Sequence, residues 1–401
     1  MRIQTWLYSA AQALALTSAV ITVSISAMVG KELAPMASLS TLSYGAQFAA
    51  IIFCSYLLSM SMKRFGRKPI FYLGALTLAL GGGLGALSIY WHSFALNVIA
   101  HSSFGVSLSA FAYFRFAATD GVKASEKAKV LSIVTLGGVA AAFVGPMIAK
   151  HGRLLIDDYA FSGSYLAFVL IALVLVGILL MVPKEMAEEM AEEAIPAQST
   201  VPLSDTSAQS QKILSLPLFV SIYASGFGFM LMGLLMMQSS MTLNAMGFEF
   251  ADVMFVIQCH VLAMFVPSLF MGRVIARLGA QSVIFAGYMM MLAAMLVAIY
   301  GSGYNGILAA LIGIGLGWNM LYVGGSAMVT SLKGDKHKIQ GINESAVAVL
   351  NTIGAFSAGA LFYGIGWENS NWLAMLLLVP GILLLIANRY KSQDLPSGVK
   401  V

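Results

Sequence analysis

The sequence predicts an all-α integral membrane protein with twelve transmembrane helices arranged as two six-helix halves. Hydrophobic residues make up 59% of the 401 residues and charged residues only 10%, whereas a soluble domain is typically about 25% charged. The apolar residues also occur in long runs of roughly 20 residues, the length that crosses a hydrocarbon core of about 30 Å. Soluble, disordered and collagen-like folds are therefore excluded. A disulfide-rich fold is excluded too, because both cysteines lie inside apolar runs.

Apolar runs separated by polar residues or by Gly and Pro predict six spans followed by six more. The first run is preceded by a single charge, Arg2, and shows no cleavage site, so it is interpreted as a span and not as a signal peptide. The predicted spans are about 5–28, 38–62, 69–91, 94–118, 129–149, 162–182, 214–243, 251–272, 280–302, 304–331, 341–364 and 369–388.

One long polar stretch divides the chain into an N-terminal half (1–183), a linker (184–213) and a C-terminal half (214–401). The linker begins with a Glu-rich segment and continues with Pro, Ser, Thr and Gln, a composition typical of a flexible tether. Its first part also fits a short amphipathic helix on the membrane surface. We expect the linker to lie in the cytoplasm.

The positions of the basic residues predict the orientation of the chain. With both termini in the cytoplasm, only Lys31, Lys150 and Arg153 lie in loops that face outside, and the remaining loops hold the excess of Lys and Arg, as the positive-inside rule requires. The net charge of +5 therefore reflects membrane orientation, and no nucleic-acid partner is expected. We expect a multi-pass membrane protein, with the lipid bilayer as its surroundings.

The loops after the second and eighth spans form a weak internal repeat. Arg64 precedes Gly66 by two residues, and Arg277 precedes Gly279 in the same way at the same point of the other half. Such a repeat is typical of transporters whose halves are related by an axis along the membrane normal.

The first of these loops resembles the inner-loop signature of the major facilitator superfamily. The signature places Gly first, Asp fifth, and then Arg, any residue, Gly, Arg and Arg or Lys. Ser59 replaces the Gly and Lys63 replaces the Asp, and the matching residues are Arg64, Gly66, Arg67 and Lys68. The resemblance extends over essentially the whole chain and implies the major facilitator fold, with this loop acting in gating. The stretch from Gly137 to Pro146 also resembles a motif of exporters in this superfamily, although small residues serve helix packing as well.

Ionisable groups within the predicted spans are few. Arg115 lies near the inner end of the fourth span and Glu344 in the first turn of the eleventh, so each fits either a structural role or a role in ion coupling. His101 is expected to be a satisfied polar group. Four uncharged polar side chains could hydrogen-bond an organic substrate: Asn319, Asn351, Trp318 and Tyr322. The same side chains also suit ordinary contacts between helices.

Methionine is enriched in the C-terminal half, which contains sixteen of the 25. Packing alone could explain this, because methionine fills irregular apolar gaps. Met232 and Met236 are four residues apart on the seventh span, as are His260 and Met264 on the eighth, so each pair lies on one helix face. In an antiparallel hairpin, two residues at equal depth have numbers that add to a constant. Met236 with His260 gives 496, and Met232 with Met264 gives the same sum. The four side chains can therefore form two layers.

Three thioethers and one imidazole form a soft, uncharged ligand set that suits Cu(I) better than Mg, Ca, Mn or structural Zn. Pro267 frees the carbonyl of Ala263 beside this set. Met237 and Met241 lie about 100° round the helix from the first pair and are predicted accessory ligands in a metal relay, as is Cys259.

The paired motifs Met-x-x-x-Met and His-x-x-x-Met resemble those of the CcoA-like copper importers, a branch of the superfamily that supplies copper for assembly of cbb3-type cytochrome oxidase. The resemblance implies that Met232, Met236, His260 and Met264 are the copper ligands. It also implies cytochrome oxidase copper-assembly proteins as partners and the bacterial inner membrane as the location. Copper is then the transported substrate, and no cofactor is expected.

The sequence thus predicts a secondary transporter that imports copper by alternating access. The alternative is a carrier, proton-linked and exporting, for a small organic molecule or drug; the scarcity of carboxylates within the spans disfavours it. A third possibility is a membrane scaffold or sensor that binds copper without transporting it. An enzyme is not expected, because the sequence shows neither a nucleophile–base pair nor a phosphate-binding loop.

Overall fold

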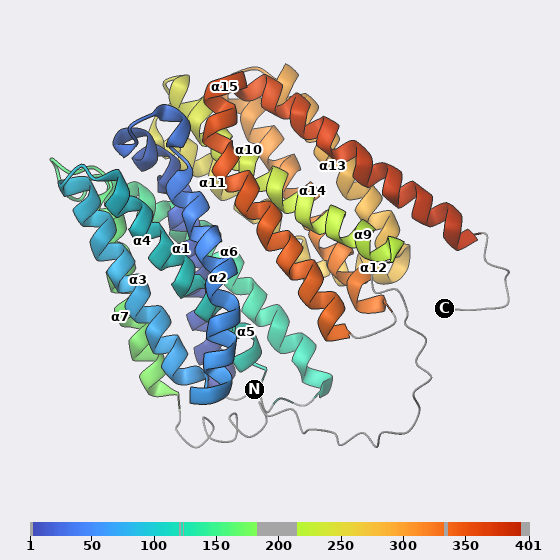
Figure 1. Ribbon diagram of the computed structural model, residues 1–401, viewed down its shortest axis with the longest axis horizontal. Coiled ribbons are helices and arrows are strands. Elements are labelled where there is room, and N and C mark those ends of the chain that lie inside the picture. Colours follow the sequence, from blue (N-terminus) through green and yellow to red (C-terminus); the bar gives the residue numbers. More distant parts are fainter. Residues whose placement is uncertain (1–2, 120–121, 123, 183–214, 333–335, 394–401) are drawn as a thin grey trace. The chain divides into compact units, whose positions relative to one another are not determined.

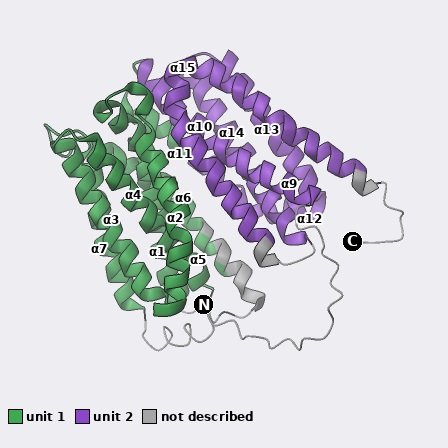
Figure 2. Ribbon diagram, viewed as in Figure 1, with its two compact units in different colours: residues 1–207, 247–258 green, residues 208–246, 259–401 purple. Residues whose placement is uncertain are grey.

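The computed structural model describes residues 3–119, 122, 124–182, 215–332 and 336–393, and the regular structure in these ranges is helical. The predicted linker lies outside them. Two compact units make up the chain (Figure 2): Met1–Ser207 with Gly247–Gln258, and Ala208–Met246 with Cys259–Val401. Each predicted span coincides with helical structure, which confirms the twelve-helix fold (Figure 1).

The helices of the first unit follow the predicted spans closely. The most extensive packing pairs are α3 with α4, α1 with α6, α2 with α4 and α3 with α7. A short 3-10 turn, η1 (Ala37–Leu39), precedes α2. The helices are α1 (Ile3–Leu33), α2 (Leu42–Phe65), α3 (Arg67–Tyr90), α4 (Phe94–Phe111), α5 (Phe114–Ala117), α6 (Ala124–Arg153) and α7 (Ser162–Met181).

In the second unit, the seventh span is built from three consecutive segments and the eighth from two. The segments of the seventh are α9 (Leu216–Ile222), the π-helical turn η2 (Tyr223–Phe227) and α10 (Gly228–Ala245). Those of the eighth are α11 (Phe250–Phe265) and α12 (Ser268–Leu278), bent by 41° at Pro267.

The last four spans form three helices. They are α13 (Ala280–Tyr300), α14 (Gly303–Ser331) and α15 (Lys336–Gln393), and α13 packs extensively on α14. Two spans are merged in α15, and the chain turns between them at Gly366, whose φ of 81° favours glycine.

The start of α11 belongs to the first unit, and one aromatic cluster connects it to the end of α6 and the start of α7. The Phe250 ring packs edge-on against Phe161 with centroids 5.3 Å apart. The Arg153 guanidinium lies over both rings, 5.3 Å from the centroid of Phe161 and 5.1 Å from that of Phe250. A cation over an aromatic face is an attractive electrostatic contact, so residues before and after the linker are tied into one unit.

Close helix contacts in the first unit depend on small residues. At Gly85 of α3, an added Cβ would lie 2.0 Å from the Tyr165 ring of α7. A larger side chain therefore could not fit without moving one helix. Small residues that permit close backbone approach are the usual basis of helix association in membranes.

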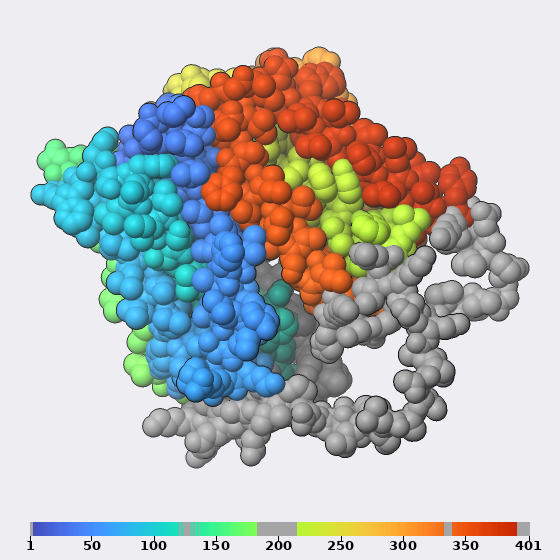
Figure 3. All heavy atoms as spheres, viewed as in Figure 1, coloured from blue at the N-terminus to red at the C-terminus, as the bar shows by residue number. Residues whose placement is uncertain are grey.

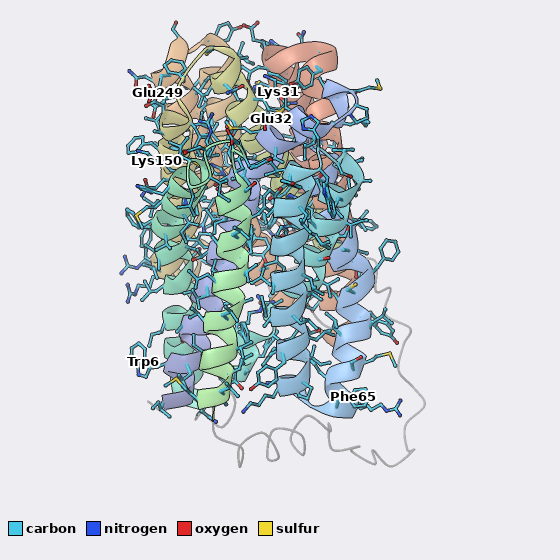
Figure 4. The ribbon with its side chains drawn as sticks, turned by 90° about the vertical axis from the view of Figure 1, so that its left-hand side faces the viewer. Trp6, Lys31, Glu32, Phe65, Lys150 and Glu249 are labelled. Carbon is cyan, nitrogen blue, oxygen red and sulfur yellow. The ribbon has the colours of Figure 1, made fainter. Side chains whose placement is uncertain are left out.

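The outward faces of the first unit are apolar along the spans and polar at their ends. On α2, Phe53 is 74% exposed, and Tyr56, Leu57 and Met60 follow on the same face. Figure 3 shows the blue spheres of this part of the chain at the surface. Figure 4 shows Lys31, Glu32, Lys150 and Glu249 at one end of the helices, and Trp6 and Phe65 towards the other. This distribution is that of a surface in contact with lipid tails, with charges at the water boundary.

Candidate functional site

The two loops of the internal repeat share one backbone conformation. Gly66 connects α2 to α3 with φ 81° and ψ 168°, and Gly279 connects α12 to α13 with φ 78° and ψ 152°. Both values lie in a region that glycine alone occupies readily. The sequence repeat is therefore also a structural repeat, with an arginine two residues before each glycine.

The inner-loop motif connects three helices of the first unit. Lys68 Nζ donates a 2.9 Å hydrogen bond to the carbonyl of Val182, just beyond the C-terminus of α7. The Arg64 guanidinium lies 5.1 Å from the centroid of the Phe65 ring. A cation at a helix C-terminus satisfies a carbonyl that lacks an intrahelical partner. The motif thus holds the ends of α2, α3 and α7, and its gating role stays a prediction.

Neither ionisable group proposed for coupling lies in the protein interior. Arg115 is exposed on the four-residue helix α5 and stacks on the neighbouring Phe116 at 4.8 Å. Glu344 is exposed and lies eight residues into α15, because that helix begins at Lys336. The expected position of Glu344 in a first helical turn is wrong, so stabilisation by the helix dipole does not apply to it.

The Gly-rich stretch of the fifth span serves packing. A Cβ at Gly137 would lie 3.0 Å from Ala13 of α1, and one at Gly145 would lie 2.6 Å from Val20 of the same helix. The small residues of α6 therefore let α1 approach closely. The structure supports the packing interpretation of this motif.

His101 belongs to a fully buried polar network in the first unit. Its Nε2 lies 3.0 Å from the Tyr165 hydroxyl, which also accepts a 2.8 Å hydrogen bond from Asn97 Nδ2. Asn97 donates a second bond, of 3.2 Å, to Ser88. His101 Nδ1 has no partner among the described residues. The network links α3, α4 and α7, which indicates a structural role.

His260 is held in one orientation by α14. Its Nδ1 lies 2.7 Å from the carbonyl oxygen of Leu311. A carbonyl only accepts, so Nδ1 carries the proton and Nε2 keeps its lone pair. Nε2 is buried and has no hydrogen-bond partner among the described residues. Gly315 makes this possible, because a Cβ there would lie 2.8 Å from His260 O and 3.2 Å from Nδ1.

Contacts with α14 place the four predicted ligands at two depths. On the α10 side, Gly228 packs against Leu321, and the two helices are antiparallel. Continuing this register places Met232 level with residue 317 and Met236 level with residue 313. On the α11 side, His260 contacts residues 311 and 315, and Met264 contacts residue 319. The register supports the pairing of Met236 with His260 and of Met232 with Met264.

The two methionine pairs of α10 lie on different faces. Met230 lies against Gly354 of α15, and Gly233 lies against Asn351 of the same helix. Met237 and Met241 fall on this α15 face by helical geometry, whereas Met232 and Met236 lie on the side of Gly228, which faces α14. Met237 and Met241 are buried. Their position favours packing against α15 over service in a metal relay.

Cys259 is half-buried beside His260 and remains a predicted accessory ligand. Among the described residues, no three His, Cys, Asp or Glu side chains come together as a metal site. A metal ion bound by the described residues would therefore need methionine sulfur atoms among its ligands.

An aromatic cluster lies halfway along α14. The rings of Trp318 and Tyr322 are stacked, with centroids 5.3 Å apart and planes within 8°. Phe229 of α10 meets both edge-on, at 5.1 and 6.0 Å. The Trp318 Nε1–H is buried without a partner among the described residues. The sequence pointed to Trp318 and Tyr322 but not to Phe229, which precedes Trp318 by about ninety residues in the chain.

One side-chain amide on α10 and one on α14 are only partly hydrogen-bonded. Gln238 Nε2 donates to the carbonyl of Ala358 at 3.0 Å, while its Oε1 has no partner in the described structure. Asn319 Nδ2 donates to the carbonyl of Met264 at 2.7 Å, and its Oδ1 likewise has none. Buried polar atoms are normally hydrogen-bonded, so these two oxygens are exceptions within the second unit.

The comparisons with known proteins agree on the family. The model of the Major Facilitator Superfamily matches residues 7–338. The riboflavin transporter RfnT of Brucella anthropi is 32% identical over 384 residues, which cover 94% of each chain. The uncharacterized transporter YddS of Bacillus subtilis is 24% identical, covering 89% of this chain and 83% of its own. The relative at 32% is a riboflavin transporter and not a copper importer, so these comparisons do not support the copper-importing branch.

Solved structures show the same fold at low sequence identity. The D-xylose–proton symporter structure superposes with a TM-score of 0.71 at 13% identity, covering 95% of this chain and 96% of the other. The inward open conformation of the xylose transporter XylE from E. coli gives 0.72 at 12% identity, covering 95% and 94%. With a family match over most of its length and a relative at 32% identity, the chain belongs to the major facilitator superfamily.

Proposed function

We propose that this protein is a secondary carrier of an uncharged aromatic organic molecule of the riboflavin class. The similarity to the riboflavin transporter RfnT over 94% of both chains supports this substrate class. It favours the organic-substrate alternative over the copper importer.

The observation that carries the proposal is the chemistry of the buried polar groups. Among the described residues that are buried, none is Asp, Glu, Lys or Arg; their polar side-chain groups are hydroxyls, amides, imidazoles or indoles. A charged cargo would be left without a counter-charge in such surroundings, at a high cost in free energy. Riboflavin is neutral and combines a planar ring, carbonyl and imide groups and a chain of hydroxyls, which such groups can bind.

Transport of labelled riboflavin tests the proposal. The gene is expressed in bacteria that cannot make riboflavin, and uptake and efflux of the labelled vitamin are compared with cells carrying an empty vector. Saturable transport that is inhibited by other isoalloxazines and not by xylose is expected. Transport equal to that of the empty vector in both directions would overturn the riboflavin assignment.

Copper transport is a second candidate, favoured by the state of His260. Histidine ligands of metals typically donate one N–H to a backbone carbonyl, which fixes the tautomer and exposes the other nitrogen. His260 has this arrangement, with Nδ1 on Leu311 and Nε2 unpartnered. The predicted ligands remain Met232, Met236, His260 and Met264, a set that suits Cu(I). Copper-assembly proteins as partners and the bacterial inner membrane as location belong to this candidate.

One set of variants separates the two candidates. Met232, Met236 and Met264 are changed together to Leu, which conserves volume but removes sulfur. Cell copper content is measured by mass spectrometry, and riboflavin transport is measured in the same cells. Loss of copper accumulation with normal amounts of membrane protein would support copper, whereas copper accumulation equal to that of the parent would exclude the site.

A further inference from the structure

We infer that Trp318, Tyr322 and Phe229 form the platform on which the planar ring of the substrate stacks. The inference rests on the proposed function and names the site within the second unit. It predicts an aromatic, heterocyclic ligand whose ring presents a hydrogen-bond acceptor to the Trp318 indole.

The three rings are fixed before any ligand binds. Trp318 and Tyr322 are four residues apart on α14 and stack with their planes within 8°. Phe229 meets the two rings at 87° and 79° and so supports one edge of the stack. Offset-stacked and edge-on contacts are the favourable geometries of aromatic pairs. A ring that joins an ordered stack loses little side-chain entropy on the protein side.

The cluster retains unused binding capacity. Trp318 is 5% exposed, yet its Nε1–H has no acceptor among the described residues. A buried donor without a partner is unfavourable, so a ligand carbonyl that accepts this hydrogen bond would bind favourably. Phe229 and Tyr322, which pack against the indole, are half-buried.

Irregular backbone lies next to the cluster. The π-helical turn η2 immediately precedes Gly228 and Phe229. It packs against α14 at Gly325, where an added Cβ would lie 2.2 Å from Ser225 Oγ. Single π-helical turns are frequent at functional sites because they rotate side chains out of the regular register.

The depth of the cluster matches that of a transported substrate. Trp318 lies near the middle of α14, which runs from Gly303 to Ser331. Carriers of this kind bind substrate close to the bilayer midplane. A stacked aromatic ring at this level, with an adjacent donor, suits the isoalloxazine ring and its carbonyl groups.

Flavin fluorescence provides the direct test. Riboflavin is titrated into purified full-length protein, and quenching of flavin emission by stacking on indole is recorded. Trp318→Leu removes the ring and the donor, Trp318→Phe removes only the donor, and Trp372→Phe, at a 45% exposed site on α15, is the matched control. Because base–aromatic stacking contributes on the order of 1–3 kcal/mol, Trp318→Leu should weaken binding roughly tenfold or more. Trp318→Phe should weaken it less, and Trp372→Phe should leave it unchanged.

The outcomes separate this inference from the proposed function. If the parent protein transports riboflavin and Trp318→Leu and Trp318→Phe both bind it as tightly as the parent, the platform is wrong and the function stands. If the parent neither transports nor quenches riboflavin, the function itself fails. If Trp318→Leu does not fold, as judged by its elution as a single species and its thermal unfolding, Trp318→Phe and Phe229→Leu decide, because an unchanged affinity in both would overturn the platform.

Discussion

Asn319 on α14 donates a hydrogen bond of 2.7 Å from its side-chain amide to the backbone carbonyl of Met264 on α11. The same nitrogen lies 2.5 Å from Ser268 Oγ, at the start of α12. Between them is Pro267, which has no N–H for the carbonyl of Ala263. Backbone groups at such a break must find partners inside the protein. Asn319 provides one for the carbonyl of Met264, the residue after Ala263, and so stabilises the 41° bend between α11 and α12.

Loss of this amide should destabilise the bend. Asn319→Leu removes both hydrogen bonds and should lower the free energy of unfolding by about 1–3 kcal/mol. In a Pro267→Ala background the helix can run straight, and Ser268 N–H can then bond the Met264 carbonyl, so the same change should cost less. Thermal unfolding is measured for the parent, Asn319→Leu, Pro267→Ala and the double variant. The coupling energy between the two positions should exceed about 0.5 kcal/mol. Strictly additive effects would show that Asn319 does not act through the bend.

The paired glycines of the repeat should tolerate no side chain. Gly66→Ala and Gly279→Ala each force a Cβ onto a backbone with φ near 80°, a conformation that costs on the order of 1–3 kcal/mol for other residues. Gly83→Ala is the control, since it lies within α3 and an added Cβ has no neighbour within 4 Å. Unfolding temperatures should fall for the first two variants and not for the control. Equal effects of all three would refute the backbone argument.

The buried network of the first unit predicts a large effect of one hydroxyl. Tyr165→Phe leaves Asn97 Nδ2 and His101 Nε2 without the oxygen that now contacts both. An unsatisfied buried polar atom costs on the order of 1–3 kcal/mol, so the unfolding temperature should fall clearly. Tyr90→Phe, at a 58% exposed position, should have little effect. A Tyr165→Phe protein as stable as the parent would mean that the hydroxyl contributes nothing.

Orientation in the membrane is a further prediction. A reporter enzyme that is active only outside the cytoplasm should be inactive when fused to the C-terminus. The same reporter inserted between α6 and α7, near Lys150, should be active. Both results follow from the excess of Lys and Arg in the loops assigned to the cytoplasm. Activity at the C-terminus would reverse the topology.

The sequence predicted the spans well because the hydrophobic signal is local. Helix α3, for example, was expected at about 69–91 and runs from Arg67 to Tyr90. Features that depend on tertiary contacts were not predicted. The π-helical turn η2 has no signal of its own, and the start of α15 at Lys336 lies in a polar stretch that hydropathy assigns to a loop.

The candidate site was predicted only in part, for the same reason. Spacing identified His260 and Met264 as neighbours on one face of α11. It could not reveal that Nδ1 of His260 binds the Leu311 carbonyl, because that contact joins residues 51 apart in the chain. Phe229 was missed since nothing in its local sequence distinguishes it from an ordinary core residue. The proposed substrate class rests on the relative, because motifs alone do not fix what a carrier transports.

The uncharged interior has an electrical consequence. None of the described residues that are buried is Asp, Glu, Lys or Arg. The buried side chains therefore move no formal charge through the membrane field. The net current is set by the cargo and any ion that accompanies it. A neutral flavin moving alone would be transported at a rate independent of membrane potential. A Cu(I) ion moving alone would gain or lose about 2.3 kcal/mol for each 100 mV. Transport into vesicles held at different potentials would therefore report the charge of the transported species before its identity is known.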